Sequence, residues 1–504
     1  MLSALHVLVL VVLMVLSVRK LLGVIRSHNQ RPAPEPPGPR PLPVLGNLLA
    51  VRGGQRHEAF MQLAERFGPV YTLWFGRLHV VLLCGYDVVL EALVKRGEEF
   101  SARPSRPLYS ALMRNSGIVL ANGAKWCAQR RLAELVLRKD KGGGSMFEWS
   151  TCHETAQLIQ EMDGYDGKPF NPQPLIRLTT ANLISVLLLG HRFETTDLTF
   201  QRLLQQLDAA TQLAAGHWGQ LYDAFPSLMH YLPGPHQSLF RTWESLRQFV
   251  RKEIASCRAN HHKDTSQSYI ELCLFEMQSQ TPGPDAAQSD EDDLIHSTLD
   301  LFMAGMDTSS ATLTWALLYM VTHPDVQACV QTELDGVLGC GRGKRSPTLE
   351  DISRLHYTRA TIGEVQRLGN VIPNNLPRQA TQDMVFRGYF IAEGTMVLPL
   401  LTAVLRDPTQ WKSPLVFNPK RFLDENGHFY KPRAFIPFSI GCRACPGEDF
   451  AFEQMFLVFT FLLHHFWFSS PSGTSPPSLK PRTSTVLAPL PFQLCALPRI
   501  TKDL

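Results

Sequence analysis

Two cysteines lie three residues apart in the segment FSIGCRACPG, residues 438–447. This spacing occurs in zinc clips and in thiol–disulfide pairs, unless only one of the two thiols does chemistry. A zinc site needs two further ligands, and no second CxxC or CxxH segment is evident in the sequence. A redox pair normally has a β-α context that is missing around Cys442 and Cys445. The rest of the chain must therefore show what these thiols do.

An acid and an alcohol stand side by side as Asp307 and Thr308 in the segment AGMDTSS, residues 304–310. They lie in the middle of a long helix, which the sequence predicts from Ser289 to His323, before Pro324. Glycine and hydroxyl residues weaken a helix interior, and hydroxyls compete for its backbone carbonyls. Taken alone, the segment is either a hydrated helix kink or a functional site inside the helix.

Charged residues of opposite sign follow downstream. In GEVQR, Glu364 and Arg367 lie three apart on one helical face, close enough to pair, and FNPKRF supplies Arg421 as a second cation. An E-x-x-R pair is common by chance. The cysteine segment follows the far more specific pattern F-x-x-G-x-R-x-C-x-G, formed by Phe438, Gly441, Arg443, Cys445 and Gly447.

With these motifs the chain resembles the cytochrome P-450 superfamily, in particular its microsomal family-2 heme-thiolate monooxygenases. The resemblance covers essentially the whole chain, because FSAR, NGAKW, AGMDTSS, HPDVQ, GEVQR, NPKRFLD and the cysteine segment follow in the family order. It implies a mainly α fold with a minor β lobe (α+β) and a single large heme domain. It also implies heme b as cofactor, with Cys445 as the axial thiolate ligand of the iron and Cys442 at a variable position.

The resemblance also implies roles for other residues around the heme. Its two propionates would be bound by Arg103, Trp126, Arg130, Arg378 and Arg443. Phe438, Gly441 and Gly447 would shape the loop around the sulfur, whose donor strength favours cleavage of the O–O bond.

On the other side of the heme, the resemblance implies that the long helix contributes Ala304 and Gly305, with the glycine widening a groove for dioxygen. Asp307 and Thr308 would deliver protons to the dioxygen through water. A structural ion cluster would be formed by Glu364, Arg367 and Arg421.

The remaining sequence must position these residues. Its 504 residues are 44% hydrophobic and 19% charged, which is globular composition, and the net charge of +4 is too balanced to indicate a nucleic-acid partner. The ten cysteines are scattered, which favours a reducing compartment. Helical periodicity dominates, and apolar alternation over residues 69–85 predicts an early β-hairpin. We therefore predict one large domain over residues 50–504.

The N-terminus is different. Residues 2–18 are almost wholly apolar and are followed by Arg19 and Lys20, so residues 1–27 are predicted to be a transmembrane anchor. Basic residues on this side place the rest of the chain in the cytosol. A cleaved signal peptide, the alternative, usually has a basic start and a shorter apolar stretch. Proline-rich residues 28–49 predict a semi-rigid hinge.

By resemblance, the protein lies in the endoplasmic reticulum membrane, in contact with lipid. It would receive electrons from NADPH–cytochrome P-450 reductase, with cytochrome b5 as a second candidate donor, because the chain has no flavin or nicotinamide module. Acidic surfaces of these partners would dock on a basic helix face. That face is formed by Arg130, Arg131, Arg138 and Lys139.

The substrate pocket is predicted between residues 107–120, 300–308 and 371–377, whose apolar side chains favour small lipophilic substrates. These are xenobiotics, fatty acids such as arachidonic acid, or steroids. Asn374 and Asn375 would orient a polar group of the substrate or serve as turn residues. The alternatives to a monooxygenase are a heme protein without turnover and a peroxide isomerase. The Asp307–Thr308 pair argues against the isomerase, because such members of the superfamily commonly lack it.

Overall fold

The computed structural model describes residues 32–499 except for 44, 52–55, 77, 115, 140–145, 260–267, 280–283, 341–343 and 483–484. The predicted anchor, residues 1–27, lies outside the described residues, and the predicted hinge is described only from residue 32. Across the described ranges, no helix has both the length and the apolar character that a bilayer crossing requires.

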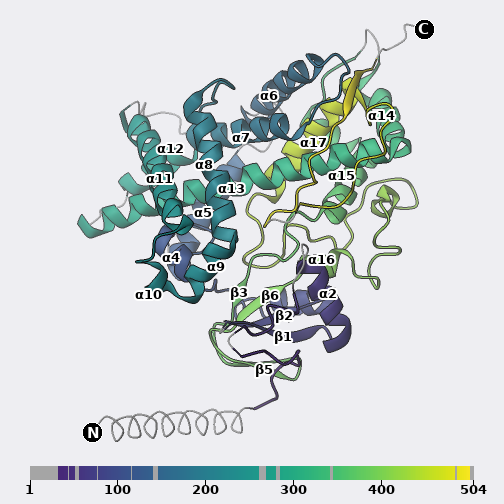
Figure 1. Ribbon diagram of the computed structural model, residues 1–504. Coiled ribbons are helices and arrows are strands. Elements are labelled where there is room, and N and C mark those ends of the chain that lie inside the picture. The colour runs from purple at the N-terminus through teal and green to yellow at the C-terminus, as the bar shows by residue number, and fades with distance from the viewer. Residues whose placement is uncertain are drawn as a thin grey trace, which may run out of the picture.

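Helices build one large lobe, and the longest of them, α13 (Pro284–Thr322), runs through its centre (Figure 1). At 1.5 Å per residue it spans about 58 Å. Around it, in chain order, are α4 (Pro107–Met113), α5 (Gly123–Lys139), α6 (Met146–Asp163), α7 (Gln173–Leu189), α8 (Leu198–Ala215), α9 (His217–Ala224), α10 (Pro226–Met229), α11 (Pro235–Ala259), α12 (Tyr269–Ser279), α14 (Pro324–Leu338), η3 (Leu349–Ser353), α15 (His356–Gly369), η4 (Pro419–Phe422) and α17 (Glu448–His465).

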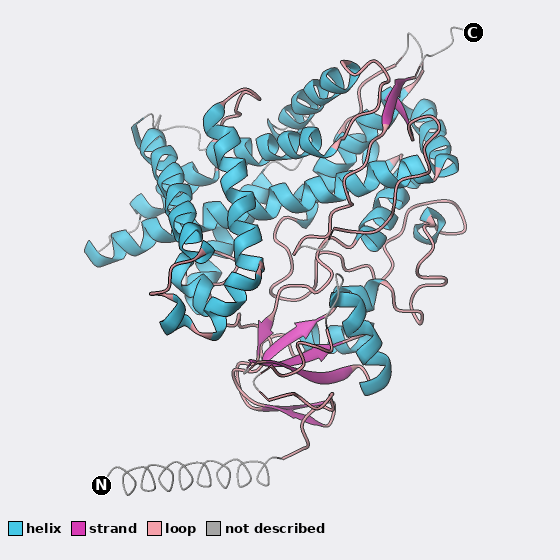
Figure 2. Ribbon diagram, viewed as in Figure 1, coloured by secondary structure: helices cyan, strands magenta, loops and turns pink. Residues whose placement is uncertain are grey.

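The smaller lobe holds a four-stranded sheet flanked by short helices (Figure 2). Its strand order is β1 (Val70–Phe75), β2 (Leu78–Leu83), β6 (Met396–Pro399), β3 (Arg378–Gln379). The antiparallel pairing of β1 with β2 confirms the predicted early hairpin. The smaller lobe also contains α2 (Arg56–Phe67), α3 (Tyr86–Leu90), the π-helix η1 (Glu91–Lys95), α16 (Leu401–Leu405) and the β4 (Met384–Phe386)–β5 (Tyr389–Ile391) hairpin. The β7 (Phe466–Ser469)–β8 (Cys495–Pro498) pair lies instead beside α17 in the helical lobe (Figure 1). The predicted mainly α fold with a minor β lobe is thus confirmed.

The described part of the proline-rich hinge is docked on this small lobe. The backbone N–H of Thr72 donates to the carbonyl of Pro37 at 2.8 Å, and that of Phe390 donates to the carbonyl of Pro34 at 2.8 Å. These bonds tie the hinge to β1 and β5, so the orientation of this segment is fixed by the sheet as well as by its prolines.

The helix α13 begins before the predicted start at Ser289. Proline suits the first turn of a helix because its missing N–H needs no partner there, and the helix starts at Pro284. The predicted end is confirmed, since α13 stops at Thr322 and Pro324 begins α14.

Close packing fixes the middle of α13. A Cβ atom at Gly305 would lie 2.7 Å from Cδ1 of Ile184, so the missing side chain lets α13 approach α7. Further along, Leu318 packs in the same buried cluster as Phe456 and Phe459 of α17. The acid–alcohol pair therefore sits on a helix held by neighbours on two sides.

Candidate active site

The cysteine segment folds into a tight loop that leads into α17. The N–H of Cys445 donates to the carbonyl of Phe438 at 2.9 Å, and the N–H of Ala444 donates to the carbonyl of Gly441 at 3.0 Å. Gly441 has φ +80°, and a Cβ atom there would lie 1.9 Å from the carbonyl oxygen of Leu93 in η1. Only glycine fits this position, because the backbones of the loop and η1 nearly touch.

The thiol of Cys445 faces open space inside the protein. It keeps exposed surface, yet the surrounding protein raises its pKa by burial. The N–H of Gly447 donates to the sulfur, and this bond together with the charge of Arg130 opposes the rise of the pKa. The following helix, α17, directs its positive end toward the loop, which favours a thiolate.

Gly447 has a different explanation from Gly441. A Cβ atom there would meet only Cδ2 of Leu137, at 4.0 Å, so the protein's own packing does not require glycine. An open glycine beside an accessible thiol fits a large flat ligand lying against the loop, as predicted for heme.

Cys442 has other surroundings. Its thiol points to the carbonyl of Gly97 at 3.9 Å, whereas Cys445 accepts from Gly447. Both cysteines are free thiols. Among the described residues, no group of three or more His, Cys, Asp and Glu side chains is placed to hold a metal ion.

Three arginines predicted to bind the propionates come together next to this loop. Burial is the main cause that lowers the pKa of Arg378 and of Arg443 to about 10. The pKa of Arg103 falls well below its ordinary value, through burial and then through the charges of the other two. In the described part of the chain, none of the three forms an ion pair with an acid. Nε of Arg378 and Nη1 of Arg443 are buried without a hydrogen-bond partner.

Neutral acceptors hold these arginines in place. Arg103 donates to the carbonyls of Leu376 and Pro377, and Arg378 donates to the carbonyl of Arg443 at 3.3 Å. Such bonds fix the orientation of the guanidinium groups and leave their charge uncompensated. Three buried cations with two unused N–H groups fit the two carboxylates of heme, because each unmatched charge favours an anion.

Two more residues complete this cluster. The ring of Trp126 lies 3.8 Å below the guanidinium of Arg443, which is a cation–π contact. The side chain of Asn122 accepts from Nη2 of Arg443 at 3.0 Å and from the backbone N–H of Arg103 at 2.8 Å. Asn122 stands inside the NGAKW motif, but its bridging position was not predicted, because nothing local in the sequence indicates its two partners.

Arg130, the fifth predicted propionate ligand, is engaged elsewhere. Its guanidinium donates to Glu134 one turn along α5 and to the carbonyl of Ala444 in the cysteine loop. The structure therefore shows this arginine bracing the loop beside Cys445, and its contact with a propionate stays a prediction.

The acid–alcohol pair lies in the middle of α13. The hydroxyl of Thr308 donates to the carbonyl of Ala304 at 2.6 Å, so its oxygen keeps its lone pairs for another donor. Ala304 is exposed between the buried residues Phe302 and Met306, which shows that this face of the helix borders open space. The groove role predicted for Gly305 stays untested, whereas its contact with Ile184 gives it a packing role.

The pKa of the Asp307 carboxyl is raised. Burial raises its pKa to about 6, while the charge of Arg177 opposes the rise. Nη2 of Arg177 lies 3.6 Å from Oδ1 of Asp307, and Nη1 of the same arginine bonds to Asp208 of α8. Arg177 comes from α7, far away in the sequence, and sequence reasoning missed it. A carboxyl with a pKa near neutrality can both hold and release a proton at working pH.

The predicted ion cluster is present and complete. Both Glu364 oxygens accept from Arg367, at 2.7 and 2.8 Å, and Nε of Arg421 donates to Oε1 at 3.0 Å. The remaining N–H groups of Arg367 donate to backbone carbonyls of Leu405, Pro414 and Val416. All donors of this buried arginine are used, so the cluster fixes the chain after α16 against α15.

The structure joins two of the predicted pocket walls. Oδ2 of Asp300 accepts from the N–H groups of Ile118 and Val119, at 3.0 and 2.9 Å, and burial raises its pKa to about 7. In the third wall, Asn375 has φ +58°, accepts from the N–H of Leu376 at 2.8 Å and donates to the hydroxyl of Ser439 in the cysteine loop at 2.9 Å. Oδ1 of Asn374 is buried without a partner.

The predicted basic face of α5 is described only in part. Arg131 lies 3.3 Å from Glu276 of α12, and its side chain is 64% exposed. Arg130 points inward, as described above. The side chains of Arg138 and Lys139 lie outside the described residues.

Comparison with known proteins gives one consistent family. A sequence model described as Cytochrome P450 matches residues 36–496. Mouse (Mus musculus) Cytochrome P450 2J5 is 39% identical over 499 residues, covering 99% of this chain and 97% of that protein. Human (Homo sapiens) Cytochrome P450 2J2 is 40% identical over 472 residues, covering 94% and 93%. Human Cytochrome P450 2W1 is 39% identical over 496 residues, covering 97% and 99%.

Proposed function

This chain belongs to the cytochrome P450 family, and from that premise we propose that it oxygenates small lipophilic substrates with electrons from NADPH–cytochrome P450 reductase. Proteins of the family are heme monooxygenases and bind heme b through an axial cysteine thiolate. When bound, this group supplies the activation of dioxygen, and the protein's residues must hold it, protonate dioxygen and position the substrate.

The observation that carries the proposal is the accessible thiol of Cys445 in its closed loop. The donor from Gly447 and the positive end of α17 favour its ionised form, which is the form that binds iron. Arg103, Arg378 and Arg443 supply the cations for the propionates. Phe438, packed partly buried beside the loop, limits access of water to the sulfur.

We assign proton delivery to Asp307 and Thr308. Asp307 takes a proton from solvent along the polar path that Arg177 and Asp208 form between α7 and α8. With a pKa of about 6 it gives the proton up readily to water. Because the hydroxyl proton of Thr308 is committed to Ala304, its oxygen can hold that water close to the reacting dioxygen.

Two electrons per turnover come from the reductase, with cytochrome b5 as a second donor. The support is Arg131 of α5, whose side chain is 64% exposed and available to an acidic partner surface. We assign residues 1–27 to an anchor in the endoplasmic reticulum membrane, with the heme domain, residues 50–504, on its cytosolic side.

We place the substrate between residues 107–120, 300–308 and 371–377. The chemical class is an apolar molecule such as a xenobiotic, a fatty acid such as arachidonic acid, or a steroid. Asp300 supports this assignment, since it fixes the first of these segments to α13 and gives the pocket a stable wall.

The test uses the full chain, purified with heme in a lipid or detergent system. The reduced protein treated with carbon monoxide should show the strongly red-shifted Soret band of thiolate ligation. With reductase and NADPH it should convert members of a panel of fatty acids, steroids and xenobiotics. In Cys445→Ser the shifted band and the products should vanish, whereas Cys442→Ser is the matched control. A shifted band or undiminished product in Cys445→Ser would refute the proposal.

A further inference from the structure

A cavity separate from the predicted heme site lies between the C-terminal half of α13, the end of α15 and two loops. Its volume is about 330 Å³, at the small end of ligand pockets. It shares no residue with the heme or proton-delivery residues. Its lining consists of Trp315, Tyr319, His323, Leu368, Gly369, Arg406, Leu415, Val416, Phe417, Leu479, Pro481 and Leu487.

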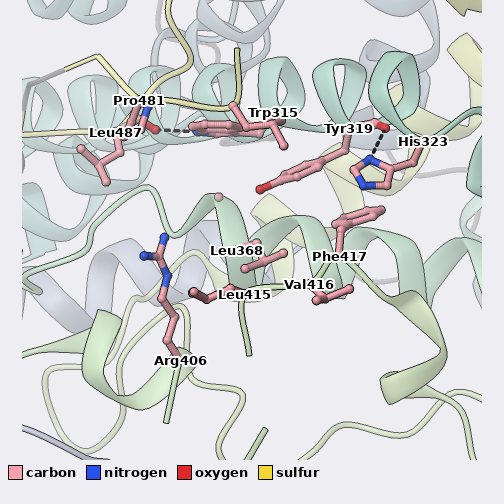
Figure 3. Close-up of a pocket in the computed structure, with 12 residues that line it drawn as sticks. Trp315, Tyr319, His323, Leu368, Arg406, Leu415, Val416, Phe417, Pro481 and Leu487 are labelled. Atoms are coloured by element: carbon pink, nitrogen blue, oxygen red, sulfur yellow. Dashed lines mark hydrogen bonds between the residues drawn. The ribbon is translucent and has the colours of Figure 1, made fainter. Parts of the chain in front are cut away.

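One wall of the cavity is aromatic. Tyr319 and Phe417 are stacked with ring centroids 4.4 Å apart and nearly parallel planes, and Trp315 stacks on Tyr319 at 5.7 Å. The indole N–H of Trp315 already donates to the carbonyl of Leu487 at 2.8 Å, so this ring is held in place (Figure 3). Such a wall favours a flat aromatic ligand, because an added ring extends the stack.

The cavity contains one cation and no acid. Figure 3 shows the guanidinium of Arg406 directed into the space beneath Trp315 and Tyr319. Its Nε is buried without a partner, and no described residue accepts a hydrogen bond from its side chain. Burial lowers its pKa, but an arginine remains charged at neutral pH. Glu58 favours this charge through space without forming an ion pair with it.

Tyr319 adds a second donor. Burial raises the pKa of its hydroxyl, which therefore stays protonated and able to donate. Nδ1 of the neighbouring His323 is occupied, since it lies 3.2 Å from the carbonyl of Tyr319 and 3.0 Å from Oγ1 of Thr322. One guanidinium and one phenol beside an aromatic wall match a carboxylate on an aromatic ring.

We propose that this cavity is a second ligand site, which binds a small aromatic carboxylate through Arg406. The carboxylate compensates the unpaired guanidinium, and the ring lies against the stacked wall of Trp315, Tyr319 and Phe417. Leu415, with 71% of its surface exposed, stands at the mouth and gives the ligand its entry from solvent.

Equilibrium dialysis measures the binding of 2-naphthoate to the full heme-loaded protein. An azole is added to block the heme site. We expect one 2-naphthoate to bind per chain. The affinity for the neutral 2-naphthamide should be lower by a factor of about ten or more. Arg406→Gln should lower the affinity for naphthoate by about tenfold and leave that for naphthamide unchanged. Arg359→Gln is the matched control, because Arg359 is another cation with a buried unpaired Nε but lies outside the cavity.

A second variant covers the case in which Arg406→Gln does not fold. Leu415→Trp changes an exposed residue and narrows the mouth, so it should weaken both probes. Equal naphthoate affinity in wild type and Arg406→Gln, displacement of naphthoate by the azole, or full binding to Leu415→Trp would each overturn the proposal. Binding is read without turnover, so the result is independent of the proposed monooxygenase activity.

Discussion

Arg367 and Arg378 are both almost completely buried, at 0% and 1% exposure, but they are bonded very differently. Arg367 uses all its N–H groups, and its charge is balanced by Glu364. Arg378 donates one hydrogen bond, to the carbonyl of Arg443, leaves Nε unpaired and has two further cations as neighbours.

This difference in bonding distinguishes an arginine that stabilises the fold from an arginine that is available to bind an anionic ligand. A buried cation with a buried counter-ion is stable only while both charges are present, so the loss of either residue should destabilise the fold. A buried cation without an anion is unfavourable in the protein alone and becomes favourable when an anionic group binds. We therefore expect the first cluster to act on stability and the second to act on heme binding.

The largest expected effect comes from breaking the complete cluster. Glu364→Gln leaves Arg367 and Arg421 buried without their counter-charge, which should lower the free energy of unfolding by about 3–5 kcal/mol. Denaturant unfolding and the yield of folded protein measure this. Added heme should not restore stability, and the exposed Glu425→Gln should behave as wild type. An unfolding curve for Glu364→Gln that matches wild type contradicts the structural role.

Asp307 is an intermediate case, since Arg177 pairs with it only at 3.6 Å. Asp307→Asn keeps the shape and removes the transferable proton, so product formation should fall about 100-fold while heme and substrate still bind. Steady-state product analysis with reductase measures it.

The same variant tests the pKa. Because the folded-state pKa of Asp307, about 6, lies above its unfolded value, the native state binds the proton more tightly. Wild type should therefore lose stability as pH rises from about 4 to about 6, relative to Asp307→Asn. Parallel pH profiles of the two proteins would argue against the raised pKa.

A substitution among Arg103, Arg378 and Arg443 should change heme binding. Arg378→Gln is expected to weaken heme binding by about tenfold. The heme-free protein should instead gain about 1–3 kcal/mol of stability, because a cation with a folded-state pKa below its unfolded value disfavours folding at every pH below about 10. Heme titration and unfolding of the heme-free protein measure the two effects. Destabilisation of the heme-free protein would place Arg378 with Arg367 and remove the contrast.

The smallest effect belongs to the second cysteine. Cys442→Ser should leave the carbon monoxide spectrum unchanged and alter stability by less than about 0.5 kcal/mol, because its thiol makes only a weak 3.9 Å contact to Gly97. A lost Soret shift would show that both cysteines of the segment hold the heme site together.

The sequence predicted those parts of the site whose partners are close in the chain or belong to a specific motif. Glu364 and Arg367 lie one helical turn apart, so their pairing follows from spacing alone, and the hairpin over residues 69–85 follows from alternation. The start of α13 was predicted at Ser289, because serine is common at the N-cap of a helix, whereas the helix in fact starts at Pro284.

What could not be predicted depends on contacts between distant elements. Arg177 reaches Asp307 because α7 packs against α13, as the close approach of Ile184 to Gly305 also shows. Likewise, Asn122 bridges two arginines that the sequence separates by more than three hundred residues, and the engagement of Arg130 with Ala444 depends on how α5 meets the cysteine loop. Such arrangements follow from packing, which local spacing does not encode.

The uninterrupted course of α13 sets a limit on chain length. Asp300, Asp307 and Trp315 project at fixed angles around the axis of one helix. An inserted residue rotates all later side chains of the helix by about 100° relative to the earlier ones. A single-residue insertion after Ser310 would leave the acid–alcohol pair in place and swing Trp315 and Tyr319 away from Arg406. Natural variation along this stretch should therefore consist of substitutions, with insertions and deletions confined to the loops at either end.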